Sequence, residues 1–128
     1  FIGGLLTNFP QMKKRIEKLH DLLKKKEKGE LAVYTKKEQL LIQRDIDRLD
    51  RDFGGVSSLT NIPNVIVIVD PRHESMCVLE AVRMHIPVVA NTDCTLEGIE
   101  YPVVGNDGSV KAVRFFLETI KTALSVEA

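Results

Sequence analysis

The sequence predicts an α/β protein in two parts, a helical hairpin over residues 1–55 and an α/β domain over residues 56–128. Apolar residues recur at heptad spacing in the first part, and a continuous β-branched run opens the second. The charge changes at the same place: residues 1–55 hold 13 Lys and Arg against 9 Asp and Glu, whereas the remaining 73 residues hold 5 against 9. The balanced total of 18 against 18 therefore hides a dipolar molecule.

The first helix is predicted to begin after Thr7 or Asn8, either of which can cap it. Pro10 falls in the first turn, where its missing N–H costs little. The helix ends near Gly29, after lysines that suit the negative end of a helix. Its apolar residues are three and four apart and form a heptad seam of Phe9, Met12, Ile16, Leu19 and Leu23.

The second helix opens at Thr35, and Glu38 three residues later completes a capping box. Gly54 and Gly55 end it, and its seam consists of Ile42, Ile46, Leu49 and Phe53. Two seams joined by a short loop predict an antiparallel coiled-coil hairpin with about 20 residues per arm, which makes it roughly 30 Å long. The hairpin either packs on its own domain or offers solvated faces to a partner, and its basic character favours a polyanion.

In the second part, the pattern predicts strands near residues 65–70, 86–90 and 101–104, and helices near 74–84 and 109–124. The first strand is β-branched throughout, as in a strand buried on both faces. The residues expected on the inner side of the last helix are Val113, Phe116, Leu117, Ile120 and Leu124. The order strand, helix, strand, strand, helix is typical of a parallel three-layer (Rossmann-like) sheet.

Three short parallel strands with two helices make a thin core, and an open sheet of this kind normally has more strands. We therefore expect this to be a partial sheet whose N-terminal part is missing from the chain. A missing N-terminal segment or another chain would complete it. The chain begins at Phe1 rather than at methionine, which indicates a processed product or a fragment.

Several functional classes find no support in the sequence. No apolar run approaches the ~18 residues of a membrane span, and nothing resembles a signal peptide, so no membrane partner is expected. Cys77 and Cys94 lack zinc or disulfide spacing and have no neighbouring histidine that would make them nucleophiles. His20, His73 and His85 lie in three separate elements, so we expect structural or surface roles for them and no metal or cofactor.

Asp70, Asp93 and Asp107 each follow or end a predicted strand, at the sheet edge where α/β proteins bind ligands such as Mg²⁺. A phosphoacceptor site also needs a lysine after a late strand, and residues 103–106 supply none. The 105–108 turn could cradle a phosphate, although a structural turn is the stronger expectation. The turn after the first strand lacks the glycines of a dinucleotide site. We therefore expect no catalytic residue, and expect the aspartates to cap helices and loops.

Several short motifs stand in order along the whole chain. They are Phe-Ile-Gly-Gly-Leu-Leu-Thr-Asn-Phe at 1–9, Thr-Lys-Lys-Glu at 35–38, Phe-Gly-Gly at 53–55, Ile-Pro-Asn at 62–64 with the strand ending in Asp70, Glu80-Ala81, Ile86-Pro87, and Asp93 with Gly105-Asn106-Asp107. Together these motifs resemble the ribosomal protein S-two family, the second protein of the small ribosomal subunit. Phe1 stands where the family has an opening Trp.

The resemblance implies a non-enzymatic structural constituent of the small ribosomal subunit that supports translation. It would bind rRNA at the junction of head and body, beside neighbouring small-subunit proteins. Family members carry a further N-terminal half of the α/β domain that is absent here. The drifted motifs favour an organellar ribosome, mitochondrial rather than plastid, with the bacterial cytoplasm as the other location.

The residues expected to bind RNA lie in the hairpin and its lead-in, where cations would meet phosphates with little base specificity. They are Thr7, Asn8, Lys13, Lys14, Arg15, Lys18, Lys24, Lys25, Lys26, Lys28, Lys36 and Lys37. The rival interpretation is a small α/β ligand-binding or enzymatic domain with a dimerising hairpin. It predicts seams that face a second copy and a ligand at the carboxyl ends of the strands.

Overall fold

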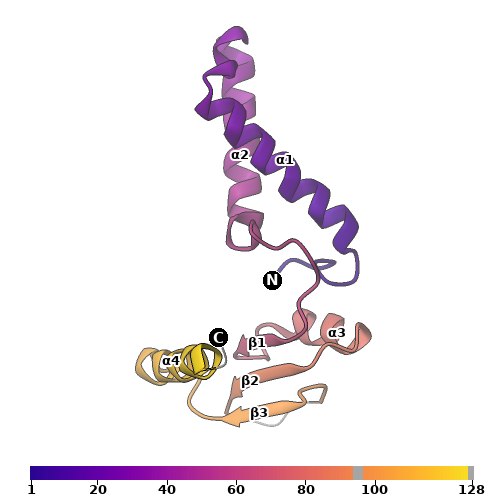
Figure 1. Ribbon diagram of the computed structural model, residues 1–128, viewed down its shortest axis with the longest axis vertical. Helices are drawn as coiled ribbons and strands as arrows, with labels where there is room; N and C mark the ends of the chain where they lie inside the picture. Colours follow the sequence, from indigo (N-terminus) through magenta and orange to yellow (C-terminus); the bar gives the residue numbers. More distant parts are fainter. Residues whose placement is uncertain (94–96, 127–128) are drawn as a thin grey trace. The chain divides into compact units, whose positions relative to one another are not determined.

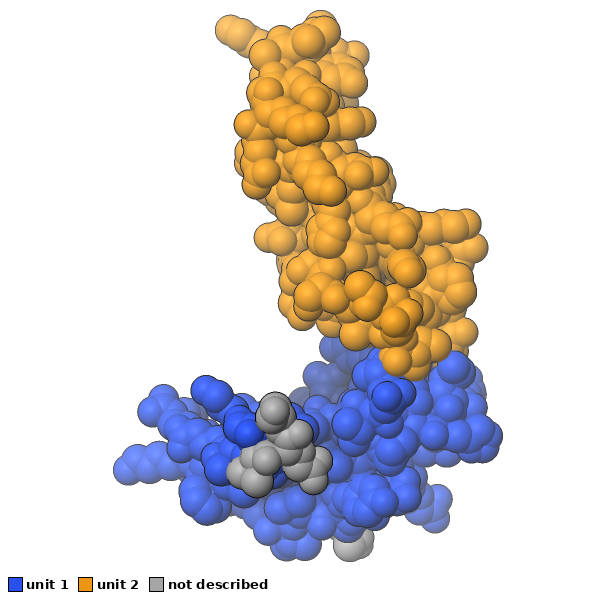
Figure 2. Space-filling view, viewed as in Figure 1, with its two compact units in different colours: residues 1, 63–128 blue, residues 2–62 orange. Residues whose placement is uncertain are grey.

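A computed structural model describes residues 1–93 and 97–126. Its backbone contacts divide the chain into two compact units, residues 2–62 and residues 63–128 together with residue 1 (Figure 2). The boundary between residues 55 and 56, expected from the sequence, stays a prediction. Among the described residues, no helix combines the length and apolar character needed to cross a bilayer.

The first unit is a helical hairpin, with α1 (Phe9–Glu27) and α2 (Lys36–Phe53) side by side in Figure 1. Asn8 occupies the N-cap position of α1, but its side chain makes no capping hydrogen bond. At the other end, Gly29 adopts a left-handed φ of 71°, which glycine tolerates without a Cβ clash. The chain then passes through the short 3₁₀ helix η1 (Glu30–Val33) into α2.

The predicted capping box at the start of α2 is confirmed. The Thr35 backbone N–H donates to Glu38 Oε2 over 2.9 Å, and the Glu38 N–H donates back to Thr35 Oγ1 over 3.4 Å. These bonds satisfy backbone donors that a helix start otherwise leaves to water. After Phe53 the chain turns through a second 3₁₀ helix, η2 (Gly54–Val56).

The two apolar seams meet inside the hairpin, as predicted. Leu19 is fully buried and Phe53 is 1% exposed. The core of the hairpin consists of Leu5, Met12, Ile16, Leu19, Ile46 and Phe53, with Ile2, Leu22, Leu23, Ile42, Leu49 and Val56 half-buried around it. Burial of this apolar cluster between the two helices is the main contribution to the stability of the hairpin.

The second unit contains a three-stranded parallel sheet in the order β1-β2-β3, which confirms the predicted fold class. Its elements are β1 (Ile66–Val69), α3 (Ser75–Arg83), β2 (Val88–Thr92), β3 (Tyr101–Val104) and α4 (Val110–Val126), shown in Figure 1. Ile66 is in register with Val88, and Val89 with Tyr101. Its buried apolar residues are Ile68, Cys77, Val78, Ala81, Ile86, Val88, Ala90 and Phe116.

Two burial predictions for this unit were wrong. Val67, expected in a strand buried on both faces, is 40% exposed, and of the expected inner side of α4, Leu117 and Leu124 are 47% and 69% exposed. Only Phe116 in that set is buried, while Val113 and Ile120 are half-buried. The physical reason is that β1 has a neighbouring strand on one side only, so the described residues provide too little surface to cover these side chains.

Candidate nucleic-acid interface

The solvent-facing surface of α1 is basic. At about 100° per residue, Lys14 and Lys25 fall on the side of the helix opposite the apolar seam. Both are exposed, as are the other lysines of α1. Lys24, Lys25 and Lys26 lie in the last turn, where cations interact favourably with the negative end of the helix dipole.

Three of the predicted RNA-binding cations have side-chain contacts to other residues of the hairpin unit. Lys13 Nζ donates to the Thr60 carbonyl over 3.2 Å and ties the segment after α2 to α1. Lys18 Nζ lies 3.1 Å from Asp45 Oδ2 and joins the two helices. The Lys28 ammonium lies 4.0 Å from the Glu30 carboxyl, a weak contact between exposed groups.

The remaining predicted cations are not neutralised by the protein itself. Their side chains make no hydrogen bond or ion pair within residues 1–93 and 97–126: Lys14, Arg15, Lys24, Lys25, Lys26, Lys36 and Lys37. Lys36 and Lys37 also sit in the first turn of α2, at the positive end of the helix dipole, where cations are unfavourable. An anionic partner would relieve this repulsion.

Three arginines of α2 were not among the predicted RNA-binding residues, and one of them, Arg51, lies 3.9 Å from the Asp52 carboxyl. Arg44, Arg48 and Arg51 are exposed on α2, on the side away from its seam. Their spacing of four and three residues places them in one stripe along the helix. The helical spacing of the arginines is present in the sequence, but four aspartates in the same segment made it hard to recognise.

A hollow of about 260 Å³ lies between the two helices of the hairpin. Arg15 and Arg48 line it, together with the ion pair of Lys18 and Asp45. Within the described residues, neither arginine has an ion-pair partner. Two guanidinium groups beside one hollow can bind phosphate oxygens through paired N–H donors.

Thr7 and Asn8 lie in the lead-in to α1, and both are exposed. The turn before them depends on Gly4, which has a left-handed φ of 87° and a position where a Cβ would lie 3.0 Å from Met12 Cε. Gly4 thus lets the lead-in pack closely against α1. The predicted RNA contacts of Thr7 and Asn8 stay predictions.

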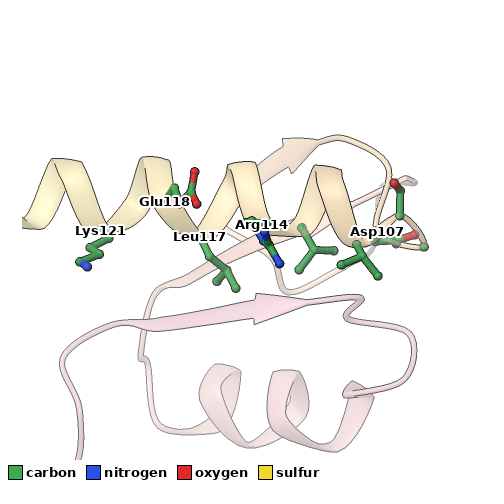
Figure 3. A pocket seen from close by; sticks show the side chains of 9 residues that line it. Asp107, Arg114, Leu117, Glu118 and Lys121 are labelled. Atoms are coloured by element: carbon green, nitrogen blue, oxygen red, sulfur yellow. The ribbon is translucent and has the colours of Figure 1, made fainter.

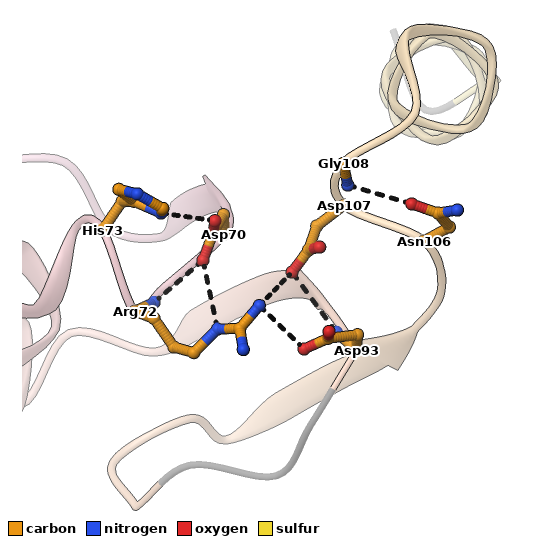
Figure 4. Close-up of polar contacts among 7 residues, drawn as sticks. All are labelled: Asp70, Arg72, His73, Asp93, Asn106, Asp107 and Gly108. Atoms are coloured by element: carbon orange, nitrogen blue, oxygen red, sulfur yellow. Dashed lines mark hydrogen bonds and ion pairs between the residues drawn. The ribbon is translucent and has the colours of Figure 1, made fainter.

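The second unit brings Asp70, Asp93 and Asp107 together at the carboxyl ends of the strands (Figure 4). Between them lies Arg72, which the sequence reading did not single out. Its guanidinium is 3.1 Å from Asp93, 3.6 Å from Asp70 and 3.8 Å from Asp107. The cluster therefore carries its own counter-charge, and within the described residues no group of His, Cys, Asp or Glu has the arrangement of a metal site.

The side chains of the turn before α4 accept two backbone hydrogen bonds. Asn106 Oδ1 accepts the Gly108 N–H over 3.0 Å, and Asp107 Oδ2 accepts the Asp93 N–H over 3.4 Å (Figure 4). A Cβ at Gly105 would lie 2.9 Å from Asn91 Oδ1, so this position needs glycine for close approach. One donor that a phosphate would need is thus already used, which favours the structural turn.

The Asp70 carboxyl has a lowered pKa. A hydrogen bond to His73, whose Nδ1 lies 2.6 Å away, holds the pKa of the Asp70 carboxyl below its ordinary value. Asp70 also has a left-handed φ of 54° and accepts the Arg72 N–H over 3.2 Å. These contacts fix the loop after β1 rather than preparing a nucleophile.

The remaining histidines and cysteines form no cluster within the described residues. His20 is exposed on α1, and His85 is exposed just after α3 with a left-handed φ of 54°. Cys77 is buried and free, and burial raises the pKa of its thiol, which disfavours the reactive thiolate. Cys94 lies outside the described residues.

Comparison with known proteins decides the family. The family model described as "Ribosomal protein S2" matches residues 1–126. The chain belongs to the ribosomal protein S2 family. It is 36% identical over 126 residues to the small ribosomal subunit protein uS2 of Helicobacter acinonychis (strain Sheeba), covering 97% of this chain and 51% of that protein. The uS2 proteins of Helicobacter pylori (strain Shi470) and Helicobacter hepaticus (strain ATCC 51449 / 3B1) are also 36% identical, over 97% of this chain and 48% of each relative.

The chain thus spans about half the length of the curated S2 relatives it matches. These relatives are bacterial proteins, and they lend no support to the organellar location predicted from the drifted motifs.

Proposed function

We propose that this S2-family chain is a structural, non-enzymatic constituent of the small ribosomal subunit and binds rRNA through its hairpin. The observation that supports this proposal is the set of uncompensated cations on a hairpin whose apolar seams are already buried. Because the surface is charged and the core is satisfied, the hairpin is suited to a polyanion.

The binding is electrostatic. Each Lys or Arg that neutralises an RNA phosphate releases condensed counterions, so log K falls by about 0.7–0.9 per phosphate contact for each tenfold rise in salt. The cations lie on the solvent side of α1 and in a stripe on α2, and all of them are exposed. This arrangement positions the protein on folded RNA without reading a base sequence.

Base stacking has little part in this interaction. Sequence-specific RNA proteins usually stack unpaired bases on exposed aromatic side chains. In the hairpin unit Phe9 and Phe53 are buried, and Tyr34 at the loop is 46% exposed. The affinity is therefore expected to come from phosphates.

The proposed partners include a segment that completes the sheet, and the backbone indicates which edge it occupies. The Ile66 N–H donates to the Pro87 carbonyl, just before β2, and the Asp70 N–H donates to the Asn91 carbonyl of β2. The N–H groups of Val67 and Val69 therefore point to the opposite side. That edge has no proline, glycine or charge to prevent pairing. We infer that a further strand pairs there.

The other edge of the sheet, at β3, is less suited to pairing with an added strand. The Gly105 N–H donates to the Thr92 carbonyl, so by alternation Val103 also faces β2, while Pro102 and Val104 face outward. Proline lacks the N–H that an added strand would need, and it is typical of an edge strand. The sheet therefore continues beyond β1 rather than beyond β3.

Exposed apolar groups on α4 also favour an additional segment next to β1. A hollow of about 460 Å³ runs along one side of α4, and Figure 3 shows Leu117, Arg114 and Lys121 directed to that side. Val110 is 76% exposed there and Leu117 47%. A strand added next to β1, with its own helix, would cover these apolar groups.

The rival interpretation, a ligand-binding or enzymatic domain with a dimerising hairpin, is weaker. The seams that would face a second copy contact each other within one chain. The aspartates that would bind a ligand are held by Arg72. Family membership also favours the ribosomal role.

Sedimentation of the native complex from cells, with mass spectrometry of the fractions, tests the proposal and also the cellular compartment. The chain should travel with small-subunit rRNA and ribosomal proteins and dissociate only at high salt. A free monomer or dimer without RNA would contradict the proposal. The same fractions would identify the segment that completes the sheet, and organellar rather than bacterial rRNA would identify the compartment.

A further inference from the structure

The loop end of the hairpin exposes apolar side chains that are not part of its core. We name them the tip patch: Val33, Tyr34, Leu40 and Leu41, which are 90%, 46%, 53% and 53% exposed. Val33 and Tyr34 end the loop, and Leu40 and Leu41 lie about 6–8 Å along α2 from its first residue, at 1.5 Å per residue.

The loop that carries the patch is held by hydrogen bonds. The Ala32 N–H donates to the Gly29 carbonyl over 3.1 Å, and the Tyr34 N–H donates to the Leu31 carbonyl over 3.2 Å. Gln39 Nε2 donates to the Tyr34 carbonyl over 2.9 Å, next to the capping box. The backbone thus presents Val33 to solvent in a defined position, which lowers the entropy lost on binding.

No repacking of the hairpin would bury the patch. On a helical wheel Leu40 falls about 150° from the seam of α2, and Leu41 falls about 110° from it. The seam itself is occupied by Ile42 and Ile46, which pack toward α1. Any cover for Leu40 and Leu41 must therefore come from outside the hairpin.

The patch is surrounded by cations. Residues 24–37 hold six lysines, Lys24, Lys25, Lys26, Lys28, Lys36 and Lys37, against two glutamates, Glu27 and Glu30. Glu38 follows, but its carboxylate already accepts hydrogen bonds from the N–H and the hydroxyl of Thr35. The surface that fits here has an apolar centre and an acidic rim.

A protein fits this description better than RNA. Aliphatic side chains gain free energy by burial against apolar atoms, and they cannot bond to phosphates or base edges. Of the four residues only Tyr34 could stack on a base.

We propose that the tip patch docks into an apolar, acid-rimmed hollow on a neighbouring protein of the small subunit, while the flanks of the hairpin bind rRNA. The inference rests on the proposed function and assigns separate partners to two parts of the same hairpin. Hot-spot behaviour is expected at Val33, because it is the most exposed of the four.

The test is photocrosslinking in small subunits that contain the full-length protein, with benzoyl-phenylalanine in place of Tyr34 or of Lys14. The probe at position 34 should crosslink to an acidic segment of one ribosomal protein, and the probe at position 14 to rRNA. Adding Val33→Ser with Leu41→Ser should lower the protein crosslink at least about tenfold and leave the rRNA crosslink unchanged. The conservative pair Val33→Ile with Leu41→Met should retain both crosslinks.

The outcomes separate the two proposals. If the unsubstituted protein fails to sediment with small subunits, the proposed function fails. If it sediments but position 34 crosslinks to rRNA, to a second copy of the chain or to nothing, the tip-patch inference is overturned and the function stands. An equal crosslink yield in the serine variant would also overturn it.

Discussion

The Nδ1 atom of His73 lies 2.6 Å from Oδ2 of Asp70, directly after β1 (Figure 4). This contact joins two residues of one tight turn, and the other carboxylate oxygen accepts the Arg72 N–H. Arg72 in turn reaches Asp93 and Asp107, after β2 and β3. The loops after the three strands are thus connected through one guanidinium group.

The pKa of Asp70 should therefore respond more to His73 than to Arg72. Hydrogen bonding to His73 is the main cause of the lowered pKa, and the charge of Arg72 is a smaller one. His73→Ala should raise the pKa of Asp70 toward its ordinary value of 3.8, with Arg72→Gln raising it less. Carboxyl chemical shifts measured across an acid titration would show this, and a larger shift for Arg72→Gln would contradict the assignment.

Because of the same lowered pKa, the contribution of Asp70 to the stability of the fold depends on pH in a definite direction. Because the folded-state pKa of Asp70 lies below its unfolded value, its contribution to stability is present above 3.8 and is lost as the pH falls through the lower folded value. Asp70→Asn should remove this part of the acid destabilisation. The check is urea unfolding between neutral and acidic pH, with Glu97→Gln, another exposed acid of the same unit, as a control that should leave the curve unchanged.

Three glycines should differ in their tolerance of alanine. At Gly98 φ is +86° and a new Cβ would lie 2.7 Å from Val82, so Gly98→Ala combines strain with a clash and should destabilise by about 2–3 kcal/mol. Gly29 has a φ of +71° but open space, and the cost should be about 1 kcal/mol. Gly55→Ala should be nearly neutral, because the space there is open and its φ is not left-handed. Equal unfolding free energies for all three variants would refute this ranking.

The hairpin core should be sensitive at Leu19 and insensitive at Leu40. Leu19 is fully buried between the helices, and Leu19→Ala should cost about 2–5 kcal/mol through lost burial and a residual cavity. Leu40 is 53% exposed, so Leu40→Ala should cost less than about 1 kcal/mol. Urea unfolding followed by circular dichroism measures both. A dimerising hairpin would instead make stability depend on protein concentration.

The sequence predicted best those features whose interacting residues lie close together in the chain. The seams around Leu19 and Phe53 and the Thr35–Glu38 box follow from local periodicity and spacing, and the structure confirms them. The parallel sheet also followed from the alternation of strands and helices.

Burial and long-range pairing were harder to predict. Leu117 and Leu124 have the spacing of an inner helix face, yet they are exposed, because periodicity does not show whether a surface exists to cover them. Arg72 was missed since its partners Asp93 and Asp107 lie more than 20 residues away in the sequence. The RNA contacts themselves depend on a molecule that the sequence does not contain, and they stay predictions.

Neutralising two hairpin cations should weaken rRNA binding in a salt-dependent way. Lys14→Gln with Arg15→Gln removes two exposed, unpaired cations, which should lower the slope of log K against log salt by about 1.5. Filter binding to small-subunit rRNA at several salt concentrations measures it. The matched control, Arg83→Gln with Lys111→Gln, removes the same charge from the α/β unit and should leave the slope nearly unchanged.

The last prediction concerns the open edge of the sheet. The N–H of Val67 points away from β2, so Val67→Pro removes no hydrogen bond from the three-stranded sheet and should leave the β1–β2 pairing in place. It does remove a donor that an added strand would need, so the full-length protein should lose its complete sheet and its incorporation into small subunits. Ile68→Pro, one residue on, removes a bond to β2 and should disrupt both. Hydrogen exchange of the β2 amides together with sedimentation distinguishes the two variants. Normal incorporation of Val67→Pro would show that no strand pairs with β1.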